Sequence, residues 1–455
     1  MRIAMIGGGY VGLVSGACFA DLGVDVAIVE VDPVKLAMLQ SGGIPIYEPG
    51  LDRLVADNVA AGRLTFGNDV AAAVHGAEAV FIAVGTPTRR GDGHADVSYV
   101  NAAAEQVALA LTEYAVVITK STVPVGTGRR IEEIMRRARP DGQFDVASNP
   151  EFLREGSAIG DFMRPDRVVI GTESERAREV LRRLYRPLYL IEAPTLFTTL
   201  ETAELTKYAA NSFLAMKVTF INEMADLCEK VGADVHDIAR GIGLDGRIGR
   251  KFLHAGPGFG GSCFPKDTLA LMRIAQDWGA PSRLVEATVA VNDARKSSMA
   301  ARVMQAAGGS VHGKTIAVLG LTFKPETDDM RDAPSLPIVS RLAEEGAFVR
   351  AYDPVGNALA APMLPASVTF CADAYEAVTD ADILVLITEW NEFRALAPAR
   401  LRELMRGRLL MDLRNVFDPA AMQAAGFDYR GIGRGVGRGA GAALPSGAGV
   451  TEALA

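Results

Sequence analysis

The sequence predicts an α/β protein in which two parallel-sheet domains are joined by a central helical segment with one long helix. Three observations support this prediction. Short β-rich runs alternate with helical stretches in the first part of the chain, the alternation restarts near Lys314, and few helix breakers occur from about Thr199 to Lys230. Alternation of this kind is typical of parallel sheets with crossover helices.

Each element follows from local composition and spacing. Apolar residues at helical spacing predict the long helix at 199–230, and a glycine-rich loop at 256–261 precedes a further helix that begins near Pro265. The β-rich runs predict strands at 2–6, 26–30, 79–84, 116–119 and 168–170, and then at 315–319, 349–352, 383–387 and 409–411.

A chain of 455 residues is too long for one ordinary core, so several domains are expected. The last segment is rich in Gly and Ala, has almost nothing to bury, and is predicted to be disordered. The expected units are 1–198, 199–300, 301–433 and the tail 434–455.

Composition excludes several classes of protein. A net charge of −8 argues against a nucleic-acid partner, and no apolar run is long enough to cross a bilayer, so no membrane partner is expected. The N-terminus does not read as a secretory signal, and the chain has only four cysteines, which favours the cytoplasm. The histidines and cysteines lack metal-ligand spacing, so no metal site is expected.

The first expected strand leads directly into a dinucleotide-binding fingerprint. Gly7, Gly9 and Gly12 fit the G-x-G-x-x-G pattern, which allows a tight turn, close approach of a pyrophosphate, and packing of the helix on the strand. Glu30 ends the second expected strand, where a carboxylate accepts from the ribose hydroxyls and repels a 2′-phosphate. The sequence therefore predicts a Rossmann-like domain that binds NAD rather than NADP. Asp32 is the rival for this role, but it falls after the strand is expected to end.

The second α/β segment has no such fingerprint. Its first strand is followed by a single glycine, Gly320, and then by Lys324 and Arg331. These cations suit an anionic ligand that is not held by a glycine cradle. We therefore expect the cofactor on the first sheet domain and a second anionic ligand on the other.

The glycine-rich loop ends at a candidate nucleophile. Pro265 is a natural first residue of the next helix, which leaves Cys263 just before the helix N-terminus. That position and the neighbouring Lys266 are expected to lower the pKa of the thiol, and Asp267 lies close enough to polarise a water molecule. Local chemistry alone leaves a nucleophile and a packed thiol equally open. The other cysteines, Cys18, Cys228 and Cys371, lie in apolar surroundings and are interpreted as buried and inert.

Lys207 and Asn211 are spaced i, i+4 on the long helix, so their side chains project from one face. Converging on one point, they would form a donor pair for a developing oxyanion. By spacing alone, the favoured interpretation is a solvated helix face on which Lys207 pairs with Glu204.

Separate motifs occur in order along nearly the whole chain, from Met1 to about Gly433. They lie at 7–12, 84–87, 121–127, 149–156, 256–267 and 320–324, followed by Arg331. Together they resemble the UDP-glucose/GDP-mannose dehydrogenase family, and the segments 155–158 and 165–171 look most like its UDP-glucose branch. The chain departs from its relatives at two positions. Many relatives carry Asp where this chain has Glu30, and some carry Lys where it has His254.

The resemblance implies a four-electron oxidation of UDP-glucose to UDP-glucuronate that consumes two NAD and one water. It implies that Cys263 attacks the aldehyde formed by the first hydride transfer. The resulting thiohemiacetal would lose a second hydride to become a thioester, which water hydrolyses. Lys207 and Asn211 would stabilise the oxyanion and Asp267 would order the water or act as a base. Thr122 and Glu151 would assist.

The resemblance also implies binding residues. For the cofactor they are Gly7, Gly9, Tyr10, Val11, Gly12, Glu30, Lys35, Gly85, Thr86, Pro87, Thr122, Glu155, Lys266 and Arg331. For the nucleotide sugar they are Glu151, Phe152, Leu153, Arg154, Glu155, Lys207, Asn211, Arg247, Phe252, Leu253, His254, Gly256, Gly258, Phe259, Gly260, Lys324 and Arg414. A homodimer or higher homo-oligomer built on the long helix is implied, with Arg247 reaching the site of a partner subunit.

Two alternatives stay open. One is a dehydrogenase for another nucleotide sugar, such as GDP-mannose or a UDP-N-acetylhexosamine. The other is a non-catalytic sugar-nucleotide sensor, against which the complete set Cys263, Lys207, Asn211 and Asp267 argues.

Overall fold

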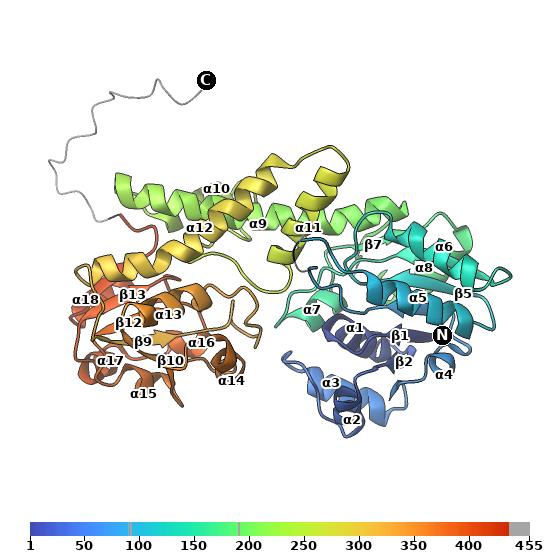
Figure 1. Cartoon of the computed structure of the whole chain (residues 1–455), viewed down its shortest axis with the longest axis horizontal. Coiled ribbons are helices and arrows are strands. Elements are labelled where there is room, and N and C mark those ends of the chain that lie inside the picture. The colour runs from blue at the N-terminus through green and yellow to red at the C-terminus, as the bar shows by residue number, and fades with distance from the viewer. Residues whose placement is uncertain (90, 92, 190–191, 436–455) are drawn as a thin grey trace.

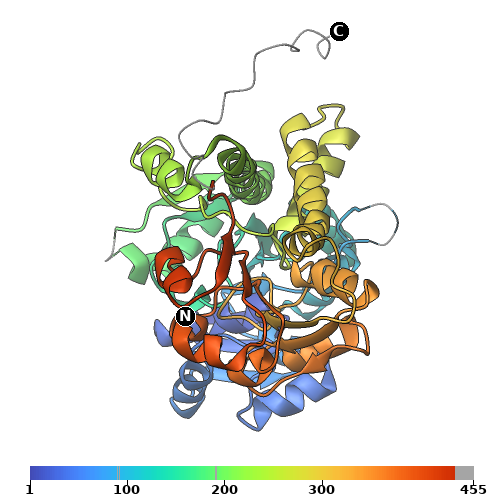
Figure 2. The ribbon, with the colours of Figure 1, turned by 90° about the vertical axis from the view of Figure 1, so that its left-hand side faces the viewer.

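The computed structural model describes residues 1–89, 91, 93–189 and 192–435. Figure 1 shows two sheet domains side by side, with the long helix α9 (Leu200–Val231) running across both. Figure 2, turned by 90°, shows that the helices of the central segment lie on one side of the two sheets. The α/β class and the long central helix expected from the sequence are confirmed.

The N-terminal sheet has eight strands in the order β3-β2-β1-β4-β5-β6-β7-β8. Neighbouring strands are parallel except β6 and β7, which pair antiparallel at Ser148 and Gly171. The strand order reverses between β1 and β4, which is where open α/β sheets bind ligands beyond the carboxyl ends of their strands. The strands are β1 (Arg2–Ile6), β2 (Asp25–Val29), β3 (Leu64–Gly67), β4 (Ala79–Ile82), β5 (Ala115–Thr119), β6 (Phe144–Ser148), β7 (Val168–Gly171) and β8 (Thr195–Thr198).

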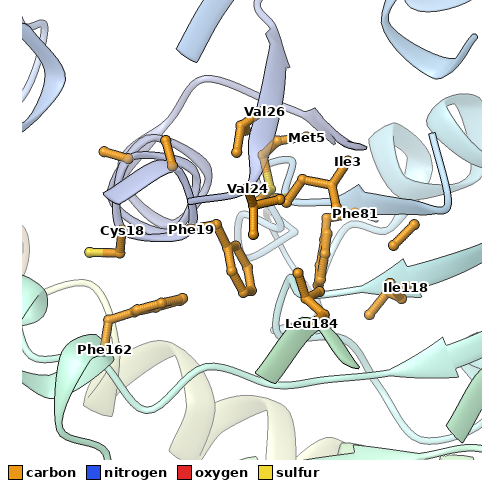
Figure 3. Packing of buried hydrophobic residues seen from close by; sticks show 14 of the residues in the cluster. Ile3, Met5, Cys18, Phe19, Val24, Val26, Phe81, Ile118, Phe162 and Leu184 are labelled. Atoms are coloured by element: carbon orange, nitrogen blue, oxygen red, sulfur yellow. The ribbon is translucent and has the colours of Figure 1, made fainter. Parts of the chain in front are cut away.

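Helices cover both faces of this sheet, with separate hydrophobic clusters on the two sides. Figure 3 shows part of one cluster, in which the ring of Phe19 lies between those of Phe81 and Phe162, at centroid distances of 5.4 and 4.9 Å. The helices are α1 (Tyr10–Asp21), α2 (Pro33–Gln40), α3 (Leu51–Ala60), α4 (Val70–Val74), α5 (Ser98–Ala110), α6 (Thr127–Ala138), α7 (Ala158–Met163) and α8 (Glu175–Tyr189).

The C-terminal sheet has six parallel strands in the order β11-β10-β9-β12-β13-β14. Its strands are β9 (Thr315–Leu319), β10 (Phe348–Tyr352), β11 (Thr369–Phe370), β12 (Ile383–Leu386), β13 (Leu409–Asp412) and β14 (Asp428–Gly431). Its helices are α13 (Ser335–Glu344), α14 (Asn357–Ala360), α15 (Ala374–Val378), α16 (Asn391–Arg394), α17 (Pro398–Leu404) and α18 (Pro419–Ala424), with a short 3-10 helix at Ala361–Met363.

The central segment is helical. The Thr199 hydroxyl accepts from the Thr202 N–H and caps α9, and Gly232, in the left-handed conformation, ends it. The other helices are α10 (Val235–Gly243), α11 (Phe264–Asp277) and α12 (Arg283–Ala306). No helix within the described ranges is long and apolar enough to cross a membrane.

The expected unit boundaries stay predictions. Residue 198 coincides with the end of β8, whereas α12 continues past residue 300 to Ala306. Of the predicted tail, Arg434 forms a β-bridge with Asp234, and the Gly435 N–H donates to the Ala233 carbonyl. Residues 436–455 lie outside the described part of the chain.

Candidate active site

The loop after β1 has the geometry of a pyrophosphate cradle. Gly7 has a φ of +111°, and a Cβ at Gly12 would lie 1.9 Å from the Gly7 carbonyl oxygen, so both positions require glycine. A Cβ at Gly9 would meet nothing within 4 Å. Gly9 therefore faces open space at the start of α1, where the first-turn N–H groups of Tyr10 and Val11 lack helical partners. The residues present fit NAD.

Glu30 stands directly after β2, next to this loop. A Cβ at Gly8 would lie 2.9 Å from its Oε2, and its Oε1 accepts from the Asp32 N–H at 2.9 Å. The Asp32 carboxylate is used elsewhere, because it accepts from the N–H groups of Val34 and Lys35 and caps α2. The structure thus favours Glu30 over Asp32 as the ribose acceptor, and it leaves the Lys35 side chain exposed.

Gly85, Thr86 and Pro87 follow β4, on the far side of the reversal in strand order. The Thr86 hydroxyl donates to the Thr122 carbonyl at 2.9 Å, which ties the loop after β5 to the loop after β4. Thr122 therefore lies with the predicted cofactor residues.

A cavity of about 790 Å³ lies where the N-terminal domain, α9 and the loop before α11 meet. Its volume is in the range of small-molecule sites. Thr122 does not line it. The predicted site residues that line it are Glu151, Phe152, Leu153, Arg154, Glu155, Lys207, Asn211, Phe252, Gly260, Cys263 and Lys324.

Lys207 and Glu151 form a buried ion pair at this cavity. The Lys207 Nζ lies 2.9 Å from Oε1 of Glu151 and donates to the Glu151 carbonyl at 2.7 Å. Burial raises the pKa of Glu151, but Lys207 outweighs burial and holds that pKa below its usual range. The alternative pairing of Lys207 with Glu204 is wrong, because Glu204 accepts from the N–H groups of Gly126 and Gly128 instead.

Asn211 and Asp267 link α9 to α11. The Asn211 amide donates to Oδ2 of Asp267 at 2.6 Å, and the Lys266 Nζ lies 2.8 Å from Oδ1. Lys207 and Asn211 both line the cavity, as their spacing on one helix face predicts.

Cys263 is the N-cap residue of α11, which begins at Phe264 and has Pro265 in its first turn. Its Sγ lies 3.5 Å from the Ser262 hydroxyl. Burial raises the pKa of Cys263 to about 11. The expectation of a lowered thiol pKa is therefore wrong, because desolvation outweighs the position at the helix N-terminus.

Lys207, rather than Lys266, is the cation that lowers the pKa of this thiol most, and Lys324 and Arg331 also interact with it electrostatically. Lys207 lowers the pKa of Cys263, whereas Glu151 and Asp267 raise it. Lys266 is paired with Asp267. Loss of either charge of the Lys207–Glu151 pair is therefore expected to change the thiolate fraction of Cys263.

Glu155 joins the N-terminal domain to the loop before α11 and to the C-terminal domain. Its carboxylate accepts from the hydroxyls of Ser262 at 2.8 Å and Thr327 at 3.3 Å, and Arg331 lies 3.5 Å away. Lys324 donates to the Glu155 carbonyl. Burial and nearby acidic charge raise the pKa of Glu155. One residue thus connects the elements predicted to hold cofactor and substrate.

The glycine-rich loop packs closely against protein atoms. A Cβ at Gly260 would lie 2.2 Å from the Asp332 carbonyl oxygen, and one at Gly258 would lie 3.0 Å from the Asn292 side-chain oxygen. We expected these glycines to fold the backbone around a ligand. They also fit the loop against α12 and the C-terminal domain, while Gly260 lines the cavity, so the role in holding a ligand stays a prediction.

Arg414 reaches this loop from the C-terminal domain. A Cβ at Gly256 would lie 2.6 Å from its Nη1, its Nε donates to the Ile387 carbonyl at 3.0 Å, and Glu389 is 3.1 Å away. Arg414 does not line the cavity.

The remaining predicted substrate residues are not gathered at the cavity. Leu253 and Phe259 are buried outside its lining, and His254 is exposed. The side chain of Arg247 is 90% exposed and pairs with Asp245. Their roles stay predictions.

Some cavity residues were not predicted from the sequence. Lys120 follows β5, and Asn149 precedes the predicted segment 151–155 by two residues. Arg167 stacks on Phe152, with its guanidinium carbon 3.6 Å from the ring centroid. Lys120 adjoins the motif at 121–127, and Asn149 and Arg167 lie inside the segments 149–156 and 165–171, a signal that could have indicated all three.

Models of one family match the chain in three consecutive parts. They are the NAD binding domain (residues 1–189), the central domain (201–294) and the UDP binding domain (317–419) of the UDP-glucose/GDP-mannose dehydrogenase family. The NAD cofactor expected from the fingerprint is thereby confirmed.

Individual proteins agree with this match. The chain is 61% identical over 436 residues to the UDP-glucose 6-dehydrogenase of Rhizobium meliloti, covering 95% of this chain and 100% of that protein. It is 48% identical to the UDP-glucose 6-dehydrogenase TuaD of Bacillus subtilis, covering 95% and 93%.

Solved structures share the fold. A UDP-glucose dehydrogenase from Pyrobaculum islandicum superposes with a TM-score of 0.87 at 38% identity, covering 95% of this chain and 98% of that one. A UDP-D-ManNAc dehydrogenase from Pyrococcus horikoshii gives 0.82 at 28%, covering 96% and 100%. The chain belongs to the UDP-glucose/GDP-mannose dehydrogenase family.

Proposed function

We propose that the protein oxidises UDP-glucose to UDP-glucuronate, with two NAD and one water, through a covalent intermediate on Cys263. The observation that carries the proposal is the arrangement of Cys263, Lys207 and Asn211 around one cavity. A two-electron alcohol dehydrogenase would have no use for the cysteine. The identities of 61% and 48% to UDP-glucose 6-dehydrogenases support this sugar nucleotide as the substrate.

When UDP-glucose binds, the primary alcohol of its sugar would lie against the cavity wall formed by Cys263, Lys207 and Asn211. Residues at Gly7–Gly12, together with Glu30, would hold NAD, which supplies the hydride acceptor for both oxidations. Lys207 and Asn211 offer donors to the oxygen on C6, because both project from the same face of α9. Glu151 keeps Lys207 oriented through the 2.9 Å ion pair.

Cys263 acts between the two oxidations. Its sulfur adds to the C6 aldehyde, and the aldehyde oxygen becomes the hydroxyl of a thiohemiacetal. Oxidation of that adduct leaves a thioester, and water then displaces the sulfur to give the carboxylate. Asp267, which Asn211 and Lys266 contact behind the cavity lining, would orient this water or accept its proton.

A dehydrogenase for another nucleotide sugar is the second candidate. The observation in its favour is the fold similarity to the UDP-D-ManNAc dehydrogenase, although at 28% identity. Presenting UDP-glucose, GDP-mannose and UDP-N-acetylhexosamines with NAD, and following NADH absorbance, separates the two. We expect UDP-glucose to give the highest kcat/KM. A non-catalytic sensor would produce no NADH with any of them.

We also propose a cytoplasmic homodimer or higher homo-oligomer. All four cysteines are free thiols, as a reducing compartment requires. An exposed apolar stripe lies on α9, at spacings that keep its members on one side of the helix. Its residues are Leu205, Phe213, Phe220, Leu227 and Val231. A second copy covering this stripe would also bring Arg247 toward a neighbouring site.

Because the Glu30 carboxylate would repel a 2′-phosphate, we expect the enzyme to prefer NAD strongly over NADP. Replacing it in Glu30→Gln should lower kcat/KM for NAD by roughly 10- to 100-fold, the worth of a hydrogen bond to a charged group. Asp32→Asn is the matched control, because that carboxylate caps α2. Equal kcat/KM for NAD and NADP in the unaltered enzyme would contradict the role of Glu30.

The covalent mechanism predicts two NADH per UDP-glucose, and a loss of acid production in Cys263→Ala without loss of the fold. Cys263→Ser should instead accumulate an enzyme–sugar ester, which intact-protein mass spectrometry detects, because its oxygen leaves less readily than sulfur. Cys371→Ala, at a buried thiol of the C-terminal domain, should keep normal turnover. Near-normal yield and rate in Cys263→Ala would end the thioester mechanism.

The apolar stripe predicts that Phe220→Glu dissociates the oligomer, because a charge would be buried at the interface. Light scattering measures the mass. Tyr99→Glu, at an exposed aromatic position on α5, should leave the mass unchanged. A monomeric unaltered protein at working concentration would contradict the assembly.

A further inference from the structure

Lys120 is a buried lysine that the proposed mechanism leaves without a role. It follows β5, its residue is 3% exposed, and it lines the same cavity as Lys207. Its Nζ donates to the Asn149 side-chain oxygen at 3.0 Å and lies 3.5 Å from the Tyr185 hydroxyl. The rings of Phe81 and Phe162, which Figure 3 shows in the aromatic core, lie 5.8 and 6.0 Å from it.

This ammonium has no carboxylate within ion-pair distance among the residues that the structure describes. The ionisable groups that face it are Tyr185 on α8, Glu151 after β6 and Lys207 on α9. Burial lowers the pKa of Lys120, Glu151 raises it, and Lys207 lowers it, which leaves it at about 8. An unpaired buried cation destabilises a fold, so its presence in a cavity suggests a functional role.

Lys120 adds a positive charge that the neighbouring ion pairs do not provide. Lys207 is paired with Glu151, and Lys266 is paired with Asp267, so each pair is neutral as a whole. Lys120 is a third cation beside the first pair. The cluster of Lys120, Glu151 and Lys207 therefore carries one surplus positive charge, which is complementary to an oxyanion.

Asn149 connects Lys120 to the turn that carries Glu151. Its side-chain oxygen accepts from both Lys120 and Tyr185, and its amide donates to the Val169 carbonyl at 2.8 Å. It is two residues from Glu151, so Lys120 also anchors the turn that presents this carboxylate to Lys207.

We propose that Lys120 is a positioning residue that acts through Glu151, offsetting the charge of that carboxylate so that Lys207 remains available to the oxygen on C6. This inference rests on the proposed oxidation of UDP-glucose. Lys120 does this only while protonated, so its contribution is lost as the pH rises through its pKa.

The first test compares the pH profiles of kcat/KM for UDP-glucose in the unaltered enzyme, Lys120→Met and Lys120→Arg. In the unaltered enzyme, part of kcat/KM should be lost as the pH rises through about 8. Lys120→Met should be slower by roughly tenfold or more at pH 7 and lack that loss, with KM changed less than about threefold. Lys120→Arg stays charged and should recover activity without the fall near pH 8.

The second test needs no turnover. The pKa of Lys120 is lower in the fold than the value near 10.4 of an unfolded lysine, so the unfolded chain binds more protons between these values. The melting temperature of the unaltered protein should therefore rise relative to that of Lys120→Met between pH 8 and 10. Lys314→Met is the matched control, because its Nζ donates to the Ala307 carbonyl and Lys314 does not line the cavity. Its melting difference should not follow this pattern.

These outcomes separate the two proposals. An unaltered enzyme that does not oxidise UDP-glucose overturns the proposed function. An active enzyme whose profile and rate are unchanged in Lys120→Met overturns the role of Lys120. If Lys120→Met does not fold, a fall near pH 8 that persists in Lys120→Arg overturns it as well.

Discussion

The buried ion pair between Lys207 and Glu151 is the interaction on which the rest of the site depends. It connects the long helix α9 to the turn that follows β6, with 2.9 Å between Nζ and Oε1. A buried pair of this kind is weak as a source of stability, because desolvation offsets its attraction. Its consequence is electrostatic, since both partners act on the Cys263 thiol, in opposite directions.

Around this pair the chain brings together residues that are far apart in sequence. Asn211 and Asp267 tie α9 to α11, which carries Cys263 at its N-terminus. Glu155 then connects the same turn region to Ser262 and to Lys324 of the C-terminal domain. The cavity therefore includes contributions from both sheet domains and from the central helix, which suits a reaction that needs a cofactor, a nucleotide sugar and a nucleophile together.

Much of the fold could be predicted from the sequence, because its strongest patterns are local. The fingerprint at Gly7–Gly12 and the helix from Leu200 to Val231 rest on spacing alone. The strands β3, β6, β8, β11 and β14 were not expected, because they are short or carry polar residues and glycine. The partner of Lys207 was also missed, since Glu151 is 56 residues away in sequence and only tertiary structure pairs them. The thiol pKa was misjudged for the same reason, because desolvation depends on packing that sequence does not show.

The charges of Lys207 and Glu151 shift the reactivity of the buried Cys263 thiol in opposite directions, which alkylation by iodoacetamide tests directly. With the pKa of the thiol at about 11, the labelling rate of the unaltered protein should rise about tenfold per pH unit from pH 7 to 10. Lys207→Met should slow labelling and Glu151→Gln should speed it, because the two charges shift the thiol pKa in opposite directions. Loosening of the site alone would speed both. Equal rates in all three proteins, or a change in the same direction in both variants, would contradict the account.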